Sequence, residues 1–177
     1  MNTRVLIRKM CVCAILAALS FVLALLAKTI FGPGPYRLTF ENMPIFIASF
    51  AYGPVMGAVV AILADIFSCI NTGMTPIPLV TVGAVVLAIS SGLVYRLCAK
   101  MKFVFKLAIS VSVGHILGSM LLKTLGLYQF YGSAVLFRIP IYIVVIILEF
   151  TLLYLLFKRR SMRDLVKSVG GDLKYED

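Results

Sequence analysis

The chain has 177 residues, of which 62% are hydrophobic and only 14% charged, and its formal net charge is +10. A soluble domain of this size needs more polar surface than so few charged residues can supply, so the composition favours lipid as the solvent. The Lys and Arg residues form short clusters between long apolar runs, which is typical of the positive-inside rule and argues against nucleic-acid binding. We therefore expect an all-α protein that crosses the membrane several times.

Six apolar segments follow one another along the chain. They cover about 5–27, 43–52, 55–70, 77–97, 103–125 and 134–157. A helix needs about 20 apolar residues to cross the hydrocarbon layer. The Gly-Pro-Gly-Pro run at 32–35 predicts a loop after the first segment. Gly53 and Pro54 interrupt the apolar stretch 43–70, which is therefore either one kinked helix or two shorter ones.

Charge decides between these alternatives. Both ends of the chain are basic, with Arg4, Arg8 and Lys9 near the start and a denser cluster from Lys158 to Lys174. The positive-inside rule predicts both ends in the cytoplasm, so the number of crossings is even. We expect six transmembrane helices in one membrane domain over 1–160, followed by a basic and polar cytoplasmic tail over 161–177. The segment 43–52 is too short to span alone and must be buried against neighbours or line a cavity.

Small residues recur one helical turn apart at three places. These are Ala14/Ala18, Gly53/Gly57 and Ser110/Gly114/Gly118. Such patterns let helices approach closely in lipid, and packing within the protein is their ordinary role. For Ala14 and Ala18 the alternative is a smooth groove on the first helix that docks a partner subunit.

The predicted outer side carries basic and aromatic residues together. Tyr36 and Arg37 lie in the first loop, Asn71 follows the third helix, and Tyr128 lies between Lys123 and Arg138. Basic groups beside tyrosines suit an anionic ligand with a flat ring. The alternative for any one of these residues is an ordinary solvated loop.

Ionisable residues inside the spans are costly in lipid and often functional. Arg138 and Tyr142 share a helix face, although Arg138 could also extend to the membrane surface. His115 lies in a stripe of small residues, where hydrogen bonding between helices is its simplest role. Asp65 could pair near a loop, and Glu149 should face inward.

Sequence signatures of catalysis are missing. The chain has no phosphate-binding Gly-x-x-x-x-Gly-Lys-Ser/Thr loop, no His-Glu-x-x-His and no Gly-x-Ser-x-Gly. A single His makes zinc binding or acid–base catalysis unfavourable. An intramembrane enzyme would have only Asp65, His115 and Glu149 as catalytic groups. We therefore expect neither an enzyme nor a metal site. A structural membrane subunit is the other remote alternative.

Several blocks carry a family resemblance. They are Tyr-Arg-Leu-Thr-Phe-Glu-Asn-Met-Pro at 36–44, Tyr-Gly-Pro-Val-Met-Gly-Ala at 52–58 leading to Ala-Asp at 64–65, the segment 114–132, and Arg-Ile-Pro at 138–140. Over residues 5–157 the sequence resembles the substrate-binding S components of energy-coupling factor (ECF) transporters. The blocks at 36–44 and 114–132 resemble the folate group in particular.

The resemblance implies six helices, an outward-facing pocket closed by the loops after the first and third helices, and no enzymatic activity. It implies a substrate-capture subunit of an importer in the cell membrane, without a cofactor of its own. A membrane scaffold subunit, docked at Ala14 and Ala18, and two ATPase subunits that hydrolyse ATP would complete the importer.

The resemblance also implies a vitamin ligand, with folate favoured over pantothenate, riboflavin or a queuosine precursor. Folate carboxylates would meet basic side chains, and the ring would lie among aromatic and amide groups. The candidate residues are Arg37, Lys123, Arg138, Tyr36, Asn71, Tyr128, Tyr142 and His115. Many folate-binding members use tryptophan around the ring, and this chain has none.

Overall fold

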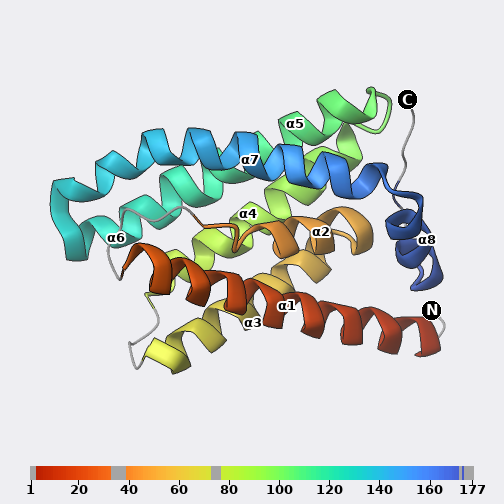
Figure 1. Cartoon of the computed structure of the whole chain (residues 1–177), viewed down its shortest axis with the longest axis horizontal. Coiled ribbons are helices and arrows are strands. Elements are labelled where there is room, and N and C mark those ends of the chain that lie inside the picture. Colours follow the sequence, from red (N-terminus) through yellow and green to blue (C-terminus); the bar gives the residue numbers. More distant parts are fainter. Residues whose placement is uncertain (1–2, 33–38, 73–76, 172, 174–177) are drawn as a thin grey trace.

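The protein is a bundle of helices in a computed structural model that describes residues 3–32, 39–72, 77–171 and 173 (Figure 1). All the regular secondary structure in these ranges is helical. The α-helices are α1 (Thr3–Phe31), α2 (Met43–Tyr52), α3 (Pro54–Thr72), α4 (Pro78–Leu97), α5 (Phe103–Gly114), α6 (Thr124–Tyr131), α7 (Arg138–Lys158) and α8 (Arg160–Ser168). A π-helix, η1 (His115–Lys123), joins α5 to α6, and a 3₁₀-helix, η2 (Gly132–Phe137), joins α6 to α7.

Proline and glycine set several helix ends. Prolines stand at the first or second position of α2, α3 and α4, where the missing N–H costs no helical hydrogen bond. Gly32 follows α1 with a φ of +83°, a left-handed conformation that commonly terminates helices. The local chemistry of the sequence thus predicts where these helices begin and end.

Five helical segments of the described chain are long and apolar enough to cross a membrane. They are Thr3–Phe31, Pro54–Asn71, Pro78–Leu97, Phe103–Gln129 and Gly132–Lys158. Each exposes large aliphatic side chains, among them Ile15, Val55 and Ile147, which lipid would cover. An all-α protein with several membrane helices is therefore confirmed, whereas the predicted count of six spans and the orientation are not: α2 has only 10 residues.

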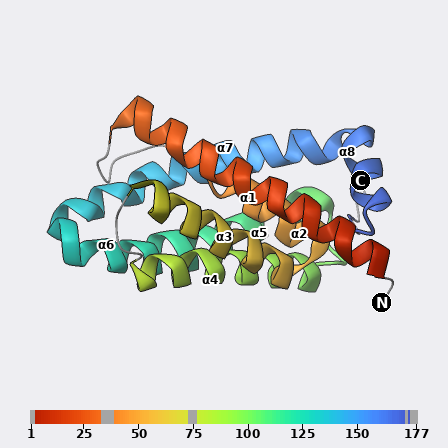
Figure 2. The same cartoon turned by 90° about the horizontal axis from the view of Figure 1, so that it is seen from below.

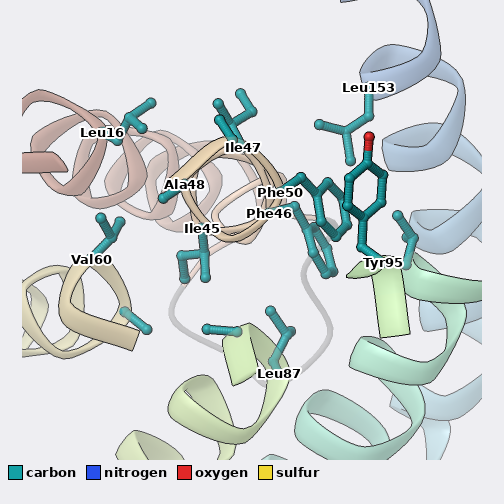
Figure 3. Packing of buried hydrophobic residues seen from close by; sticks show 14 of the residues in the cluster. Leu16, Ile45, Phe46, Ile47, Ala48, Phe50, Val60, Leu87, Tyr95 and Leu153 are labelled. Atoms are coloured by element: carbon teal, nitrogen blue, oxygen red, sulfur yellow. The ribbon is translucent and has the colours of Figure 1, made fainter. Parts of the chain in front are cut away.

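The short helix α2 lies in the middle of the bundle. Every residue from Pro44 to Ala51 is buried, so α2 is apolar on all sides as a core helix should be. Figure 3 shows its side chains among Leu16 of α1, Val60 of α3, Leu87 of α4 and Leu153 of α7. The sequence analysis predicted this burial, because a helix of 10 residues is too short to span the membrane alone.

The chain reverses direction at Gly53, between α2 and α3. The φ of Gly53 is +106° with a ψ of 164°, a conformation that is open essentially to glycine alone. On α3, Gly57 packs against Ser49 of α2 so closely that a Cβ on Gly57 would overlap the Ser49 side chain. The predicted Gly53/Gly57 pair therefore serves a tight helical hairpin, with one glycine at the turn and one at the contact.

The first helix begins at the same end of the bundle at which α8 lies (Figures 1 and 2). A Cβ on Gly170, just after α8, would lie 2.6 Å from the Val5 side chain of α1. Two ends on one side agree with an even number of crossings, and the cytoplasmic placement stays a prediction. Within the region 161–177 expected as a tail, α8 folds against the bundle through the buried Val166, while Leu165 is exposed.

Two glycines bring α4 and η1 into backbone contact. A Cβ on Gly118 would lie 2.5 Å from the carbonyl oxygen of Gly83 and 2.8 Å from the Cα of Leu87. Ser110, Gly114 and Gly118 are all buried, so this stripe of small residues packs inside the protein.

Gly118→Ala is expected to destabilise the protein by about 1–3 kcal/mol, because the added methyl group must push two backbones apart. Chemical unfolding in detergent micelles measures this loss. Val104→Ile adds one methylene group to an exposed side chain of α5 and serves as the control. Equal stability of Gly118→Ala and the control would show that α4 and η1 can separate at no cost.

Candidate functional site

The π-helix η1 positions two ionisable residues inside the bundle. We expected a regular helix over 103–125, but α5 ends at Gly114, η1 runs from His115 to Lys123, and α6 continues to Tyr131. A π-helix is rare and is frequent at functional sites. His115 is its first residue and Lys123 its last, and both side chains are buried.

His115 pairs with Glu149 of α7. The two side chains are fully buried, and His115 Nε2 lies 2.7 Å from Glu149 Oε2 in a shared hydrogen bond. The pair connects η1 to α7, and hydrogen bonding between helices was the simplest role predicted for His115. It also gives the inward-facing Glu149 a buried partner. In the described part of the chain, the remaining atoms, His115 Nδ1 and Glu149 Oε1, are buried without a hydrogen-bond partner.

Arg138 begins α7 and lies against Tyr142 one turn later. Its Nη2 donates a hydrogen bond of 2.5 Å to Tyr142 Oη, and the guanidinium carbon lies 5.2 Å from the centre of the Tyr142 ring. Only 8% of Arg138 is exposed. The shared helix face predicted this pair, and the burial shows that the guanidinium does not extend to the surface.

Lys123 binds the residues that precede α2. Its Nζ donates a 3.1 Å hydrogen bond to Asn42 Oδ1 and lies 3.5 Å from Glu41 Oε1 in a salt bridge. The Glu41 carbonyl oxygen in turn accepts a 2.5 Å hydrogen bond from Ser20 Oγ of α1. This chain of contacts ties α1, the start of α2 and η1 together.

Aromatic contacts connect the His115–Glu149 pair to Tyr142 and to Phe46 of α2, whose N–H donates a 2.9 Å hydrogen bond to the carbonyl oxygen of Asn42. The His115 ring lies 5.2 Å from the ring of Phe46 and 6.0 Å from that of Tyr142, measured between ring centres. We call the group the polar cluster; its members are Glu41, Asn42, His115, Lys123, Arg138, Tyr142 and Glu149. It involves the start of α7 and the end of η1, in the part of the bundle away from α8 (Figure 1).

The other predicted ligand residues do not join the polar cluster. Tyr36 and Arg37, and much of the loops expected to close the pocket, lie outside the described residues. Asn71 near the end of α3 and Tyr128 on α6 are exposed, and no contact in the described ranges links either to the cluster. Asp65 accepts a hydrogen bond from Thr81 Oγ1 of α4, so it pairs near a loop as one alternative predicted.

Sequence reasoning left four contributors out of the candidate binding residues. Glu41 and Asn42 appeared only within the block 36–44, Phe46 only within the apolar segment 43–52, and Glu149 only as an inward-facing ionisable residue. The available signal was the polar pair immediately before the Met43–Pro44 helix start, in the block 36–44. Asn42 is in fact 2% exposed, which marks it as an internal residue.

The polar cluster is suited to binding. Two buried cations with directed donors can hold an anion by charge-assisted hydrogen bonds, and the aromatic rings beside them can contact a flat group. Among the described residues, no group of three or more His, Cys, Asp or Glu side chains could hold a metal ion.

A comparison with known protein families identifies the class of protein. A family model described as the substrate-specific component of ECF transporters matches residues 8–158. The chain therefore belongs to the ECF transporter S-component family. Members of this family are multi-pass membrane proteins that bind small-molecule substrates and associate with an ECF module, and they are not enzymes.

A structural comparison supports the same fold. A solved S component of a bacterial ECF transporter aligns with a TM-score of 0.63 at 23% sequence identity, over 92% of this chain and 97% of the other. At this identity the likeness establishes the fold alone. A comparison with curated proteins finds no match.

Proposed function

We propose that this S component captures folate for ATP-driven uptake and that the polar cluster is its binding site. The observation that carries the proposal is the burial of two cations, Arg138 and Lys123, in the half of the bundle away from α8. A buried cation in a membrane protein is costly unless it serves a function or is well paired. The negatively charged groups of an anionic substrate would pair with both Arg138 and Lys123.

The proposed pose assigns a role to each side of the cluster. Arg138 binds a folate carboxylate, since its planar donors match a carboxylate in two parallel hydrogen bonds. Lys123, held by Asn42 and Glu41, supplies a second positive charge. The pterin ring lies against Tyr142 and Phe46, where His115 and Glu149 offer their free polar atoms to the edge of the ring. Tyr36, Arg37, Asn71 and Tyr128 would contribute from the outer loops as the substrate is enclosed.

The proposed partners are a membrane scaffold subunit and two ATPases. The sequence has no phosphate-binding loop of its own, so ATP would be hydrolysed by the partner subunits. Ala14 and Ala18 are exposed on α1 rather than packed within the protein. Small exposed residues one turn apart suit close helix packing, and we assign the scaffold contact to this face.

Arg138→Ala is expected to weaken folate binding by about 1.5–3 kcal/mol, or roughly ten- to 150-fold, because a charge-assisted hydrogen bond is lost. Equilibrium binding to the purified protein measures the change. Arg159→Ala removes an exposed arginine just beyond the other end of α7 and should leave affinity unchanged. Unchanged affinity in Arg138→Ala would exclude Arg138 from the site.

The substrate itself is tested by mass spectrometry of what copurifies with the protein, alongside binding assays with folates and other B vitamins. Folate is the expected ligand. Binding of pantothenate, riboflavin or a queuosine precursor in place of any folate would reject the folate assignment and leave the family unchanged.

A further inference from the structure

A hollow lies at the opposite end of the bundle from Arg138, beside the start of α1 and α8. Its volume is about 390 Å³. The lining includes Lys9 of α1, Tyr52 of α2, Tyr95 and Arg96 of α4, Lys106 of α5, and Gly170 after α8. It shares no residue with the polar cluster. We call it the basic pocket.

Three cations from three different helices converge on the basic pocket. Lys106 is only 3% exposed, and its Nζ lies 3.8 Å from the centre of the Tyr95 ring. The Arg96 guanidinium lies directly over Gly53 at the α2–α3 turn, and Lys9 approaches from α1. None of the described residues that line the hollow is acidic. The described lining of the pocket therefore combines three basic side chains with no carboxylate.

Phosphate groups fit this chemistry. Arginine offers donors in a planar fork that matches phosphate oxygens, lysine adds a compact charge, and tyrosine hydroxyls can donate further hydrogen bonds. The hollow also mixes ring surface from Phe50 and Tyr95 with these charges, which suits a phosphate group that carries an apolar or carbon-rich attachment.

The neighbouring helix α8 has the composition of a helix at the membrane surface. Arg160, Arg163 and Lys167 lie on α8 together with the exposed Leu165. A short helix with basic residues and an exposed aliphatic side chain is typical of the boundary between the membrane and water. We propose that the basic pocket binds a phosphate group, presented by an anionic phospholipid head group or as free phosphate.

The test compares two probes on the purified full chain in maltoside detergent. Short-chain phosphatidic acid and inorganic phosphate are titrated separately by calorimetry. The variant Lys9→Gln/Arg96→Gln removes two charges of the pocket and is expected to weaken binding at least tenfold. The control Arg8→Gln/Lys100→Gln removes two exposed charges from the same end that do not line the hollow, and should change affinity less than twofold.

The two arms separate the sources of the phosphate. Binding of phosphatidic acid alone assigns a lipid head group, and comparable binding of both probes shows that the phosphate group itself is sufficient. The proposal is overturned if neither probe binds, or if the pocket variant and the control weaken binding equally, since the effect would then reflect the general positive surface. Matching elution profiles and unfolding midpoints of the two variants establish that both are folded.

Discussion

Glu149→Ala is expected to lower the stability of the protein by about 1–3 kcal/mol, because removing one partner of a fully buried hydrogen bond leaves the His115 ring nitrogen unsatisfied. Glu149 and His115 are fully buried, and their 2.7 Å contact is the one described hydrogen bond of the His115 side chain. Chemical unfolding in detergent micelles gives the free energy. Glu149→Gln keeps an oxygen that accepts a hydrogen bond and should lose only about 1 kcal/mol.

A double replacement distinguishes a coupled pair from two independent residues. His115→Leu/Glu149→Leu removes both polar groups, and replacing a buried pair by apolar residues is often neutral. We expect the double variant to be more stable than the sum of the two single leucine losses predicts. Strict additivity would refute the coupling. If the polar cluster also binds substrate, folate affinity should fall in this variant even though the fold recovers.

Ala14→Trp and Ala18→Trp are each expected to abolish uptake while leaving substrate affinity unchanged. Both alanines are exposed on α1, so the larger side chain meets nothing within this protein. It would instead fill the surface on which the scaffold subunit packs, where small residues allow close approach of helices. Transport into vesicles that contain the complete importer measures uptake, and equilibrium binding to the isolated subunit measures affinity.

Ile30→Trp is the matched control for these variants. Ile30 is exposed on the same helix, about three to four turns beyond the two alanines and near the opposite end of α1. Tryptophan at this position tests whether bulk anywhere on α1 impairs transport. Normal uptake by both alanine variants would refute the docking role, and loss of uptake in the control would show that the effect is not specific to the Ala14/Ala18 face.

The long membrane helices could be predicted from the amino-acid sequence because a helix that crosses lipid must be apolar along its length. Each crossing needs an uninterrupted apolar segment, and the breaks at Gly32 and Gly53–Pro54 follow from backbone chemistry that acts over a few residues. The pair Arg138–Tyr142 was also predictable, since both residues lie on one helix face. The blocks at 36–44, 52–58 and 114–132 carried the resemblance to the transporter family.

The composition of the site depended on contacts between distant parts of the chain. Lys123 and Asn42 are 81 positions apart, and His115 and Glu149 are 34 apart. The length of α2 predicted that it would be buried, but no local pattern predicts which helices enclose it or that η1 is a π-helix. The same reason explains why Asn71 and Tyr128 were included on sequence grounds although they are exposed.

The sequence by itself determined the solvent, the apolar segments, the break at Gly53 and the family resemblance, because hydrophobicity and backbone preferences act locally. Only the tertiary structure decided which small residues pack inside and which face outward, so that Gly118 meets α4 while Ala14 and Ala18 remain exposed. It also brought Lys9, Arg96 and Lys106 to one hollow. Such groupings depend on how the helices are rotated and packed against one another, which is a property of the whole bundle.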